Sequence, residues 1–420
     1  MSRILLGWEL GLNFGHLSRL LPLAESLKTR GHLVLAAVRD IPTATTVLGA
    51  AGIPFVQAPF HAQGISLPHK SACYADILLS QGWANHSALW GLVQSWLNLF
   101  QLYRPDLVVL DYSPTARLAT RIARIPTVLV GNGFELPPTT TPFSGFSWAS
   151  KERVIESEQI AIENSRSVMQ SFGTPGLENL RDILTADAVF HATFAELDHY
   201  GPRHDVNYIG PLMGRAGREQ VNWPEGSGSR VYAYLRPDTM DVEAILGGLM
   251  ASGASVVCFA PGFSEAQLSP FTNPRMRFSS QLIDLTPLIS TASVCVSNGN
   301  EGTVAKFLLA GVPQLLAPQY VEAQMTARRV ETMGAGLILR GNQTVQSVSM
   351  MLDQVVRDSH YKQHAQNFAQ KYRNYDSERV VAELTDQLES IAIGQGREHD
   401  MTASSREIHP ALNNEMAHIQ

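Results

Sequence analysis

The sequence predicts an α/β protein built from two Rossmann-like, doubly wound domains that face a common cleft. Short apolar runs alternate along the chain with segments whose apolar residues recur at helical spacing. Strands that are apolar throughout and joined by helices are typical of parallel sheets covered on both faces. The pattern occurs twice, and a polar segment rich in glycine and proline separates the two series.

The expected strands are short and are followed by polar or glycine-containing segments. A helix with one apolar face follows the first strand, and Gly31 marks its end. Ligands of such sheets bind beyond the carboxyl ends of the strands, so the loops at those ends are expected to form the site. The strands are expected at 4–7, 33–38, 54–57, 107–110, 127–130 and 188–191, and then at 231–235, 256–260, 276–279, 294–297 and 314–317.

The composition changes along the chain and so predicts the domain boundaries. Residues 1–212 are expected to form the first domain and residues 231–390 the second, with an interdomain linker at 213–230. Residues 391–420 are polar and aperiodic, and we interpret them as a mobile tail.

The overall composition is that of an ordinary globular protein. Of the 420 residues, 45% are hydrophobic and 17% are charged, and a net charge of -6 provides no basic field for nucleic acid or an anionic membrane. The three cysteines lie far apart, so neither a disulfide framework nor a cysteine metal site is expected. We find no signal peptide and no apolar run long enough for a transmembrane helix, and we expect a cytoplasmic protein.

The polar stretch 297–303 (SNGNEGT) lies between an apolar strand and a segment with helical spacing. A helix N-terminus presents free backbone N–H groups and about half a positive charge, so it binds phosphate without lysine or arginine. Gly299 and Gly302 let the backbone approach a ligand closely, and Thr303 offers a hydroxyl group. The alternative is a plain helix start capped by Asn300 or Ser297.

The residues that follow extend this pattern over about forty positions. After the turn come a helix, the tripeptide GVP, an apolar strand ending in proline, the acidic Glu322 and a helix ending in GAG. This order resembles the C-terminal half of the GT-B glycosyltransferases, in particular the inverting UDP-glycosyltransferase-like family. The matching residues are Gly299, Gly302, Thr303, Gly311, Val312, Pro313, Pro318, Ala327, Arg329, Val330, Gly334, Ala335 and Gly336.

The resemblance implies a donor site in the second domain. In the family, an acidic–Gln pair holds the sugar hydroxyls, which here assigns the sugar to Glu322. Asn298 stands where the family has histidine, Asn300 replaces a glycine, and Ala323 replaces the glutamine. Arg236 is expected either to compensate for the missing imidazole or to be a solvated surface arginine. The turn implied to hold the diphosphate comprises Asn298, Gly299, Asn300, Glu301, Gly302 and Thr303.

A second motif, GHLSRLLPLA, opens the helix after the first strand. It resembles the family's N-terminal signature, which implies that His16 is the general base, a role suited to its near-neutral pKa. Asp111, at the end of the strand 107–110, corresponds to the carboxylate that orients this base. The alternatives are that His16 caps or packs a helix and that Asp111 caps the next one. The matching residues are Gly15, His16, Pro22, Leu23, Ala24, Leu27, Gly31 and His32.

A stripe of aromatic residues follows in the first domain. Trp83 and Trp90 are candidates for binding the acceptor, and the alternative for this stripe is a place in the core. The expected function is inverting, metal-independent transfer of a sugar from a nucleotide diphosphate, UDP before dTDP, to the hydroxyl of a small-molecule acceptor. No cofactor is expected besides the nucleotide-sugar co-substrate. The alternatives are a non-catalytic nucleotide-sugar-binding protein and a sugar-nucleotide epimerase.

Overall fold

The computed structural model describes residues 1–11, 14–214, 219–226 and 228–402, which form two parallel sheets flanked by helices. The first sheet contains β1 (Arg3–Trp8), β2 (Leu33–Val38), β3 (Phe55–Gln57), β4 (Leu107–Asp111), β5 (Thr127–Gly131) and β6 (Ala188–His191). The second contains β7 (Arg230–Tyr234), β8 (Ser255–Phe259), β9 (Met276–Ser279), β10 (Val294–Ser297), β11 (Gln314–Leu316) and β12 (Gly336–Ile338).

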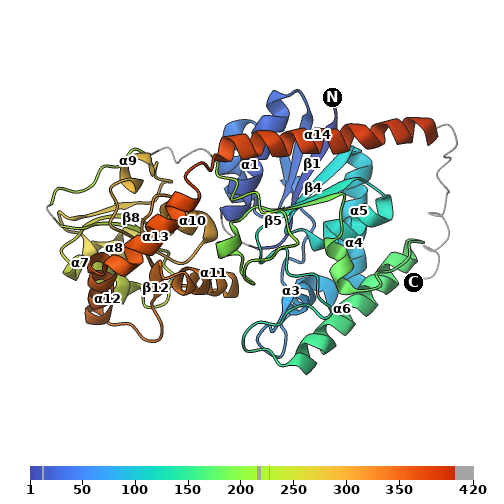
Figure 1. Ribbon diagram of the computed structural model, residues 1–420. Helices are drawn as coiled ribbons and strands as arrows, with labels where there is room; N and C mark the ends of the chain where they lie inside the picture. Colours follow the sequence, from blue (N-terminus) through green and yellow to red (C-terminus); the bar gives the residue numbers. More distant parts are fainter. Residues whose placement is uncertain (12–13, 215–218, 227, 403–420) are drawn as a thin grey trace.

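Helices connect the strands of each sheet and cover its faces, and the two domains lie side by side in Figure 1. The helices of the first half are α1 (Gly15–Thr29), α2 (Ile41–Val47), α3 (Tyr74–Leu78), α4 (His86–Tyr103), α5 (Pro114–Ala123) and α6 (Lys151–Ser171). Those of the second half are α7 (Val242–Ala251), α8 (Glu265–Leu268), α9 (Thr286–Ile289), α10 (Glu301–Leu309), α11 (Val321–Thr332), α12 (Val345–Arg357), α13 (Ser359–Lys371) and α14 (Ser377–Thr402). Single turns complete the list: η1 (Gly49–Ala51), η2 (Leu79–Trp83), η3 (Leu180–Leu184), η4 (Ala195–Leu197) and η5 (Ser269–Phe271).

Both sheets have the same internal order. The strands run β3-β2-β1-β4-β5-β6 in the first sheet and β12-β11-β10-β7-β8-β9 in the second. The order reverses between β1 and β4 and between β10 and β7, and ligands of doubly wound sheets bind at such switch points. The two motifs singled out in the sequence follow strands at these positions. His16 comes after β1, and the turn 298–303 comes after β10.

The predicted fold class is confirmed, and the expected strands occur in the order foreseen. The central strands β1, β4 and β5 are buried along nearly their whole length, which explains their continuous apolar runs. Strand β12 was not expected, because its three residues fall in a glycine-rich segment with too few apolar positions to show a period.

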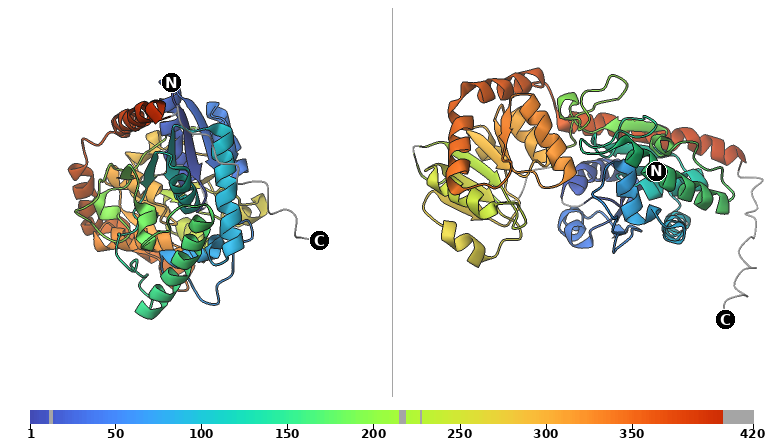
Figure 2. Two further views of the ribbon diagram at one scale, coloured as in Figure 1. Left: turned by 90° about the vertical axis from the view of Figure 1, so that its right-hand side faces the viewer. Right: turned by 90° about the horizontal axis from the view of Figure 1, so that it is seen from below.

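The end of the chain differs from the boundary expected at residue 390. Helix α14 continues to Thr402 and lies along α1 of the first domain, as Figure 1 shows, and Figure 2 shows the same crossing from two other sides. Residues 391–402 are therefore helical, whereas 403–420 of the expected tail lie outside the described residues. The buried side chains of α14 recur at helical spacing and enter the core of the first domain: Val381, Leu384, Leu388 and Ala392.

Polar contacts fix α14 to the first domain as well. The Arg30 guanidinium donates to Glu389 at 2.9 Å, and Glu389 also lies 2.8 Å from His32 Nε2. His32, which matched the N-terminal signature, is thus a structural residue that anchors the returning helix. The expected second domain therefore ends before α14, whose residues complete the first domain.

The expected linker joins the two sheets. Part of it packs on the second domain, because Val221 is buried there and the Trp223 indole N–H donates to Thr291 at 2.9 Å. Residues 215–218 and 227 lie outside the described residues. A search of the described residues finds no helix with the length and apolar character needed to cross a membrane.

The docking of α14 can be tested with Leu388→Ala. Leu388 is fully buried, so the change should lower the free energy of unfolding of the first domain by about 2–5 kcal/mol. Urea unfolding followed by tryptophan fluorescence measures this, since five of the six tryptophans lie in residues 1–212. Ile393 is 56% exposed on the same helix, and Ile393→Ala should change stability by no more than about 0.5 kcal/mol. Equal midpoints for the two variants would contradict the packing described.

Candidate active site

His16 is held at the end of β1 by stacking and by a close backbone approach. It is the second residue of α1, and its ring stacks on Trp8 with the centroids 5.1 Å apart. The preceding loop passes directly over the imidazole at Gly11, where φ is +81°. A Cβ atom at Gly11 would lie 2.3 Å from His16 Nε2, so the approach requires glycine.

Asp111 orients this imidazole. It ends β4, lies opposite Trp8 in the register of β1 and β4, and is completely buried. Its Oδ1 lies 2.8 Å from His16 Nδ1. A proton on Nδ1 can be donated to this carboxylate, which leaves the lone pair of Nε2 free. Within the described residues, His16 Nε2 makes no hydrogen bond. The pair is therefore arranged as a base and its orienting group.

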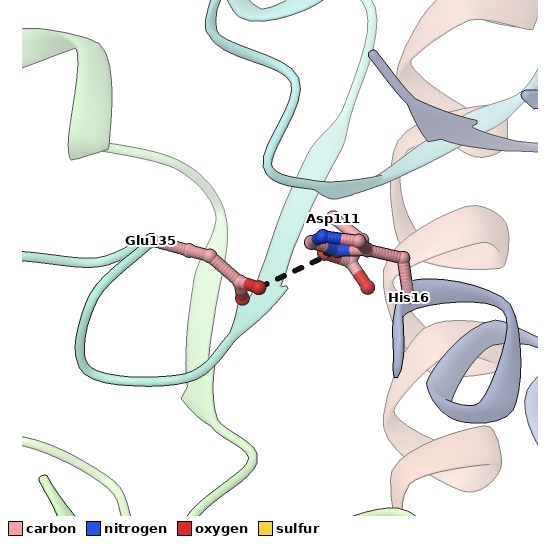
Figure 3. Close-up of side chains that lie close together, drawn as sticks. All are labelled: His16, Asp111 and Glu135. Carbon is pink, nitrogen blue, oxygen red and sulfur yellow. Dashed lines mark hydrogen bonds and ion pairs between the residues drawn. The ribbon is translucent and has the colours of Figure 1, made fainter. Parts of the chain in front are cut away.

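Two further charged residues, not foreseen from the sequence, complete the cluster. Glu135 follows β5 and places Oε1 3.4 Å from His16 Nδ1. Arg19, one helical turn after His16, donates from the same Nη1 atom to Asp111 at 2.9 Å and to Glu135 at 2.5 Å. Figure 3 shows His16, Asp111 and Glu135 pointing toward one another from three separate elements. These four residues form what we call the base cluster.

The charges of the base cluster shift the proton affinity of its members. Burial lowers the pKa of His16, but the carboxylates of Asp111 and Glu135 outweigh it and raise the pKa above the ordinary value. Burial raises the pKa of Glu135 to about 7, against the attraction of the Arg19 guanidinium. The pKa values of His16 and Glu135 are thus both raised, and the charge of each group influences the other.

The cluster also has the spacing of a possible metal site. His16, Asp111 and Glu135 each offer one ligand atom, and these atoms lie within 4.8 Å of one another. The Arg19 guanidinium, however, already contacts both carboxylates. The Arg19 guanidinium is thus the counter-ion of the Asp111 and Glu135 carboxyl groups.

The turn after β10 approaches the base cluster from the second domain. Gly299 has a φ of +82°, and its N–H lies 3.3 Å from the Ser297 hydroxyl. The Asn298 side chain is buried, and its Oδ1 accepts from the N–H of Asn300 at 3.4 Å. Asn298 thus stabilises the turn itself through its amide oxygen. The conformation of Gly299 and the hydrogen bond of Asn298 together set the direction in which the chain enters α10.

The first residues of α10 offer free donors. The N–H of Thr303 donates to the Asn300 carbonyl at 3.1 Å. The N–H groups of Glu301 and Gly302 make no hydrogen bond within the described residues, and Gly302 is exposed, with open space where a side chain would lie. Free N–H groups at a helix N-terminus are a ready anion site. The turn therefore has free N–H donors at a helix N-terminus, and its role in binding a diphosphate stays a prediction.

Glu322 connects the second domain to the base cluster. The Asn132 side-chain amide, in the loop after β5, donates to Glu322 Oε1 at 2.9 Å. The backbone N–H of Asn132 donates to Glu135 Oε2 at 2.7 Å. One asparagine therefore links the expected sugar-binding carboxylate to a carboxylate beside His16. Other hydrogen bonds between the domains lie close by, such as the one between Thr326 and His199 Nε2 at 3.0 Å.

The chain is similar to known proteins over most of its length. Residues 264–390 match the family described as "Erythromycin biosynthesis protein CIII-like, C-terminal domain". A PGL/p-HBAD biosynthesis rhamnosyltransferase of Mycobacterium bovis (strain BCG / Pasteur 1173P2) is 23% identical over 308 residues, which cover 67% of this chain and 66% of the relative. The alignment therefore spans just under two thirds of that relative.

Solved structures share the architecture. The glycosyltransferase VinC in complex with dTDP has a TM-score of 0.67 at 17% identity, covering 93% of this chain and 100% of that chain. The spinosyn rhamnosyltransferase SpnG, complexed with spinosyn aglycone, has a TM-score of 0.65 at 18% identity, covering 91% of this chain and 100% of that chain. The chain has the GT-B fold. The resemblance to GT-B glycosyltransferases carried by the two sequence motifs is thereby confirmed.

Within the GT-B fold, Arg236 lies at the same sheet edge as the turn. Tyr234 at the end of β7 pairs with Ser297 of β10, and Arg236 follows two residues later. Its Nε lies 3.4 Å from Asp238 Oδ1, and the Tyr320 hydroxyl donates to the same carboxylate at 2.9 Å. Arg236 is half-buried and so is not a fully solvated arginine, and its expected role in binding the donor stays a prediction.

The two tryptophans proposed for the acceptor have other places in the GT-B fold. Trp83 is fully buried, and its indole N–H donates to Thr115 at 3.1 Å, so it has no surface to offer. Trp90 stacks on Phe172 at the end of α6, with centroids 5.6 Å apart. Trp83 therefore cannot contact an acceptor. Trp90 is 40% exposed, and its expected role in acceptor binding stays a prediction.

Other aromatic side chains lie next to the base cluster. Tyr112 follows Asp111, and its ring stacks near His16 with centroids 6.1 Å apart. Tyr74, Phe134 and Phe146 continue this set through ring contacts of 6.0–6.3 Å. They come from separate segments without a common period, so no sequence pattern predicts that they lie together. A wall of buried rings thus borders the base on the first domain.

The close approach at Gly11 generates a testable prediction. In Gly11→Ala the new methyl group meets His16 Nε2, so the imidazole must leave its 2.8 Å bond to Asp111 or the loop must shift. Losing a buried, charge-assisted hydrogen bond costs about 1.5–3 kcal/mol, which thermal unfolding detects. Gly15→Ala is the matched control, because a Cβ atom there meets nothing within 4 Å. Equal melting temperatures for the two variants would refute the contact.

Proposed function

We propose that this protein is an inverting glycosyltransferase that moves a sugar from a nucleotide diphosphate to an acceptor hydroxyl. The observation that carries the proposal is the 2.8 Å His16–Asp111 pair, together with the electrostatic interaction between Arg19 of the same cluster and Glu301 at the start of α10. A base with its orienting carboxylate and a diphosphate site then lie on opposite sides of one domain interface. Such positioning is the main requirement of an in-line displacement.

His16 performs the proton transfer in this proposal. Its Nε2 accepts the proton of the acceptor hydroxyl while Nδ1–H donates to Asp111, which stabilises the imidazolium that forms. The acceptor oxygen then attacks the anomeric carbon from the first domain, and the diphosphate leaves toward the second. Attack and departure on opposite faces of the sugar invert the configuration at that carbon.

The second domain holds the donor in this proposal. The N–H groups of Glu301 and Gly302 and the dipole of α10 stabilise the departing diphosphate. Glu322, with Asn132 beside it, binds hydroxyl groups of the sugar. VinC is named as a complex with dTDP, and both the M. bovis relative and SpnG are named as rhamnosyltransferases. We therefore place a dTDP-deoxyhexose first among donors and a UDP-sugar, the earlier expectation, second.

The reaction is proposed to proceed without a metal ion. Diphosphate chemistry needs positive charge near the leaving group, and many enzymes use a divalent cation for it. The helix N-terminus serves this purpose on the donor side. On the acceptor side, the carboxylates that could bind a metal are already engaged by Arg19.

The acceptor is proposed to be an aromatic or largely apolar molecule. Buried rings line the first domain beside His16, and they favour such a surface over a sugar chain. The cavity bordered by Tyr74, Tyr112 and Glu135 has a volume of only about 20 Å³. An acceptor would therefore have to displace some of these aromatic side chains. We propose that the loop that carries Phe134 and Phe146 moves to make room for it.

A non-catalytic nucleotide-sugar-binding protein is the weaker alternative. The departures at Asn298 and Ala323 favour it, because they alter the donor motif. It gives no reason, however, for a buried histidine with two carboxylates and an arginine around it. Burying four such charged groups is costly unless they serve a function or are fully paired.

His16→Ala tests the proposed activity. Transfer should fall by about 10²–10⁴-fold, the usual contribution of a general base. Product is measured by mass spectrometry with dTDP- and UDP-hexoses and a panel of hydroxylated aromatic acceptors. Because His16 lies on the acceptor side, calorimetry should show dTDP binding unchanged within about twofold. Turnover close to that of the unmodified protein would rule out His16 as the base.

The pH profile provides an independent prediction. His16 must be neutral to accept a proton, so kcat/KM falls as the pH drops through the pKa of His16. Since nearby carboxylates raise that pKa, the acid limb should lie above pH 6.5, the ordinary histidine value. Glu135→Gln removes one of these carboxylates and should move the limb to lower pH. Glu152→Gln, an exposed change on α6, should leave it in place, and an upward shift with Glu135→Gln would contradict the electrostatic account.

A further inference from the structure

Glu301 is a buried carboxyl group in a turn built for an anion. It is the first residue of α10 and is only 9% exposed. Neither of its carboxyl oxygens has a hydrogen-bond partner within the described residues. A buried polar side chain without a partner is unusual and indicates a ligand, a proton or both. The inference below rests on the proposed function, because it concerns the donor of that reaction.

Charged groups from three elements face Glu301. Arg19 of α1 attracts the ionised form, whereas Glu135 of the loop after β5 and Glu322 of α11 repel it. Burial is the largest influence and raises the pKa of Glu301 to about 8. The nearby Thr193 hydroxyl acts in the opposite direction, although its own hydrogen bond goes to the Phe194 carbonyl and not to Glu301. The carboxyl group is therefore mostly neutral at pH 7, in surroundings that are already rich in acids.

A diphosphate bound at this turn would meet Glu301 directly. The free N–H groups that would receive it are those of Glu301 itself and of Gly302. An ionised carboxylate at that place would repel the anion. A neutral carboxyl group instead carries an O–H that can donate a hydrogen bond. Asn298 stands where the family signature has histidine, so the turn has no imidazole at this position. The amide oxygen of Asn298 already accepts a hydrogen bond from the Asn300 N–H.

We propose that Glu301 binds the donor as the neutral acid and donates a hydrogen bond from its carboxyl group to a non-bridging oxygen of the diphosphate. The O–H group of Glu301 then makes the hydrogen bond to the diphosphate that an imidazole N–H would otherwise make. No bond is made or broken in this step, and the proton stays on the carboxyl group while the donor is bound. The consequence is that donor affinity falls when the pH rises and the acid ionises.

Calorimetric titration with dTDP-glucose and UDP-glucose between pH 6.5 and 9.0 tests this role. Both probes keep the charge of their diphosphate over that range. With a pKa of about 8, roughly one Glu301 in eleven is still protonated at pH 9.0, so the Kd should rise about tenfold. Glu301→Gln keeps the volume and a permanent N–H donor. Its Kd should remain within about threefold of the value that the unmodified protein shows at pH 6.5, at every pH.

The variant also separates Glu301 from the base cluster. His16 lies on the acceptor side and is retained in Glu301→Gln, so a pH dependence that arises from His16 would persist in this variant. A Kd that does not change with pH in the unmodified protein would overturn the inference. So would an equal pH dependence in Glu301→Gln. Failure of both probes to bind at any pH would instead overturn the proposed function, and this inference with it.

Discussion

The salt bridges of Arg19 are the interaction on which the rest of the site depends. Two acidic side chains, Asp111 and Glu135, are buried beside Nδ1 of the His16 imidazole, and burying them together without a counter-charge would be costly. Arg19 lies three residues after His16 on α1, so both side chains project from the same face of the helix. The Arg19 guanidinium can therefore contact the two carboxyl groups that surround the His16 imidazole. The position of α1 is therefore critical, and it is fixed by packing on β1 and by the returning helix α14.

The same cluster ties the catalytic side to the donor side. Asn132 donates to Glu135 through its backbone and to Glu322 through its side chain. A displacement of either domain would therefore change the hydrogen bonds of both carboxyl groups. Arg19 also interacts electrostatically with Glu301 at the start of α10. Helix α14 limits the motion of the domains in a different way. It begins at Ser377, whose hydroxyl accepts from Met213 of the linker, and it ends on the first domain. The interface between the two domains is thus held both by the chain, through the linker and α14, and by the buried charged groups that meet there.

Much of this arrangement could be predicted from local sequence, and the rest could not. Apolar runs located the strands, and the glycine-rich turn with its following helix located the anion site, because both signals lie within a few neighbouring residues. His16 and Asp111 were accessible through a motif and a strand end. Arg19, Glu135 and Asn132 were not, because the contacts that join Arg19 to Asp111 and Glu135, and Asn132 to Glu322, span 92–190 residues and nothing local marks a buried charge. The return of α14 and the packing of Trp83 were missed or misplaced for the same reason, since both depend on which surfaces meet in three dimensions.

A balance of charge explains why the pKa values of His16, Glu135 and Glu301 are all raised. The cluster and its surroundings contain one arginine and one histidine against four carboxyl groups, Asp111, Glu135, Glu301 and Glu322. Burial and mutual repulsion raise the pKa of Glu135 to about 7 and of Glu301 to about 8, and the pKa of His16 is raised as well. The site thus retains protons that these groups would lose in water. A nucleotide diphosphate brings further negative charge into the same volume, so its arrival strengthens the hold on these protons. Asn298 in place of an imidazole is then compatible with donor binding, because the protonated Glu301 carboxyl group adds no negative charge and can donate the hydrogen bond that the imidazole would make.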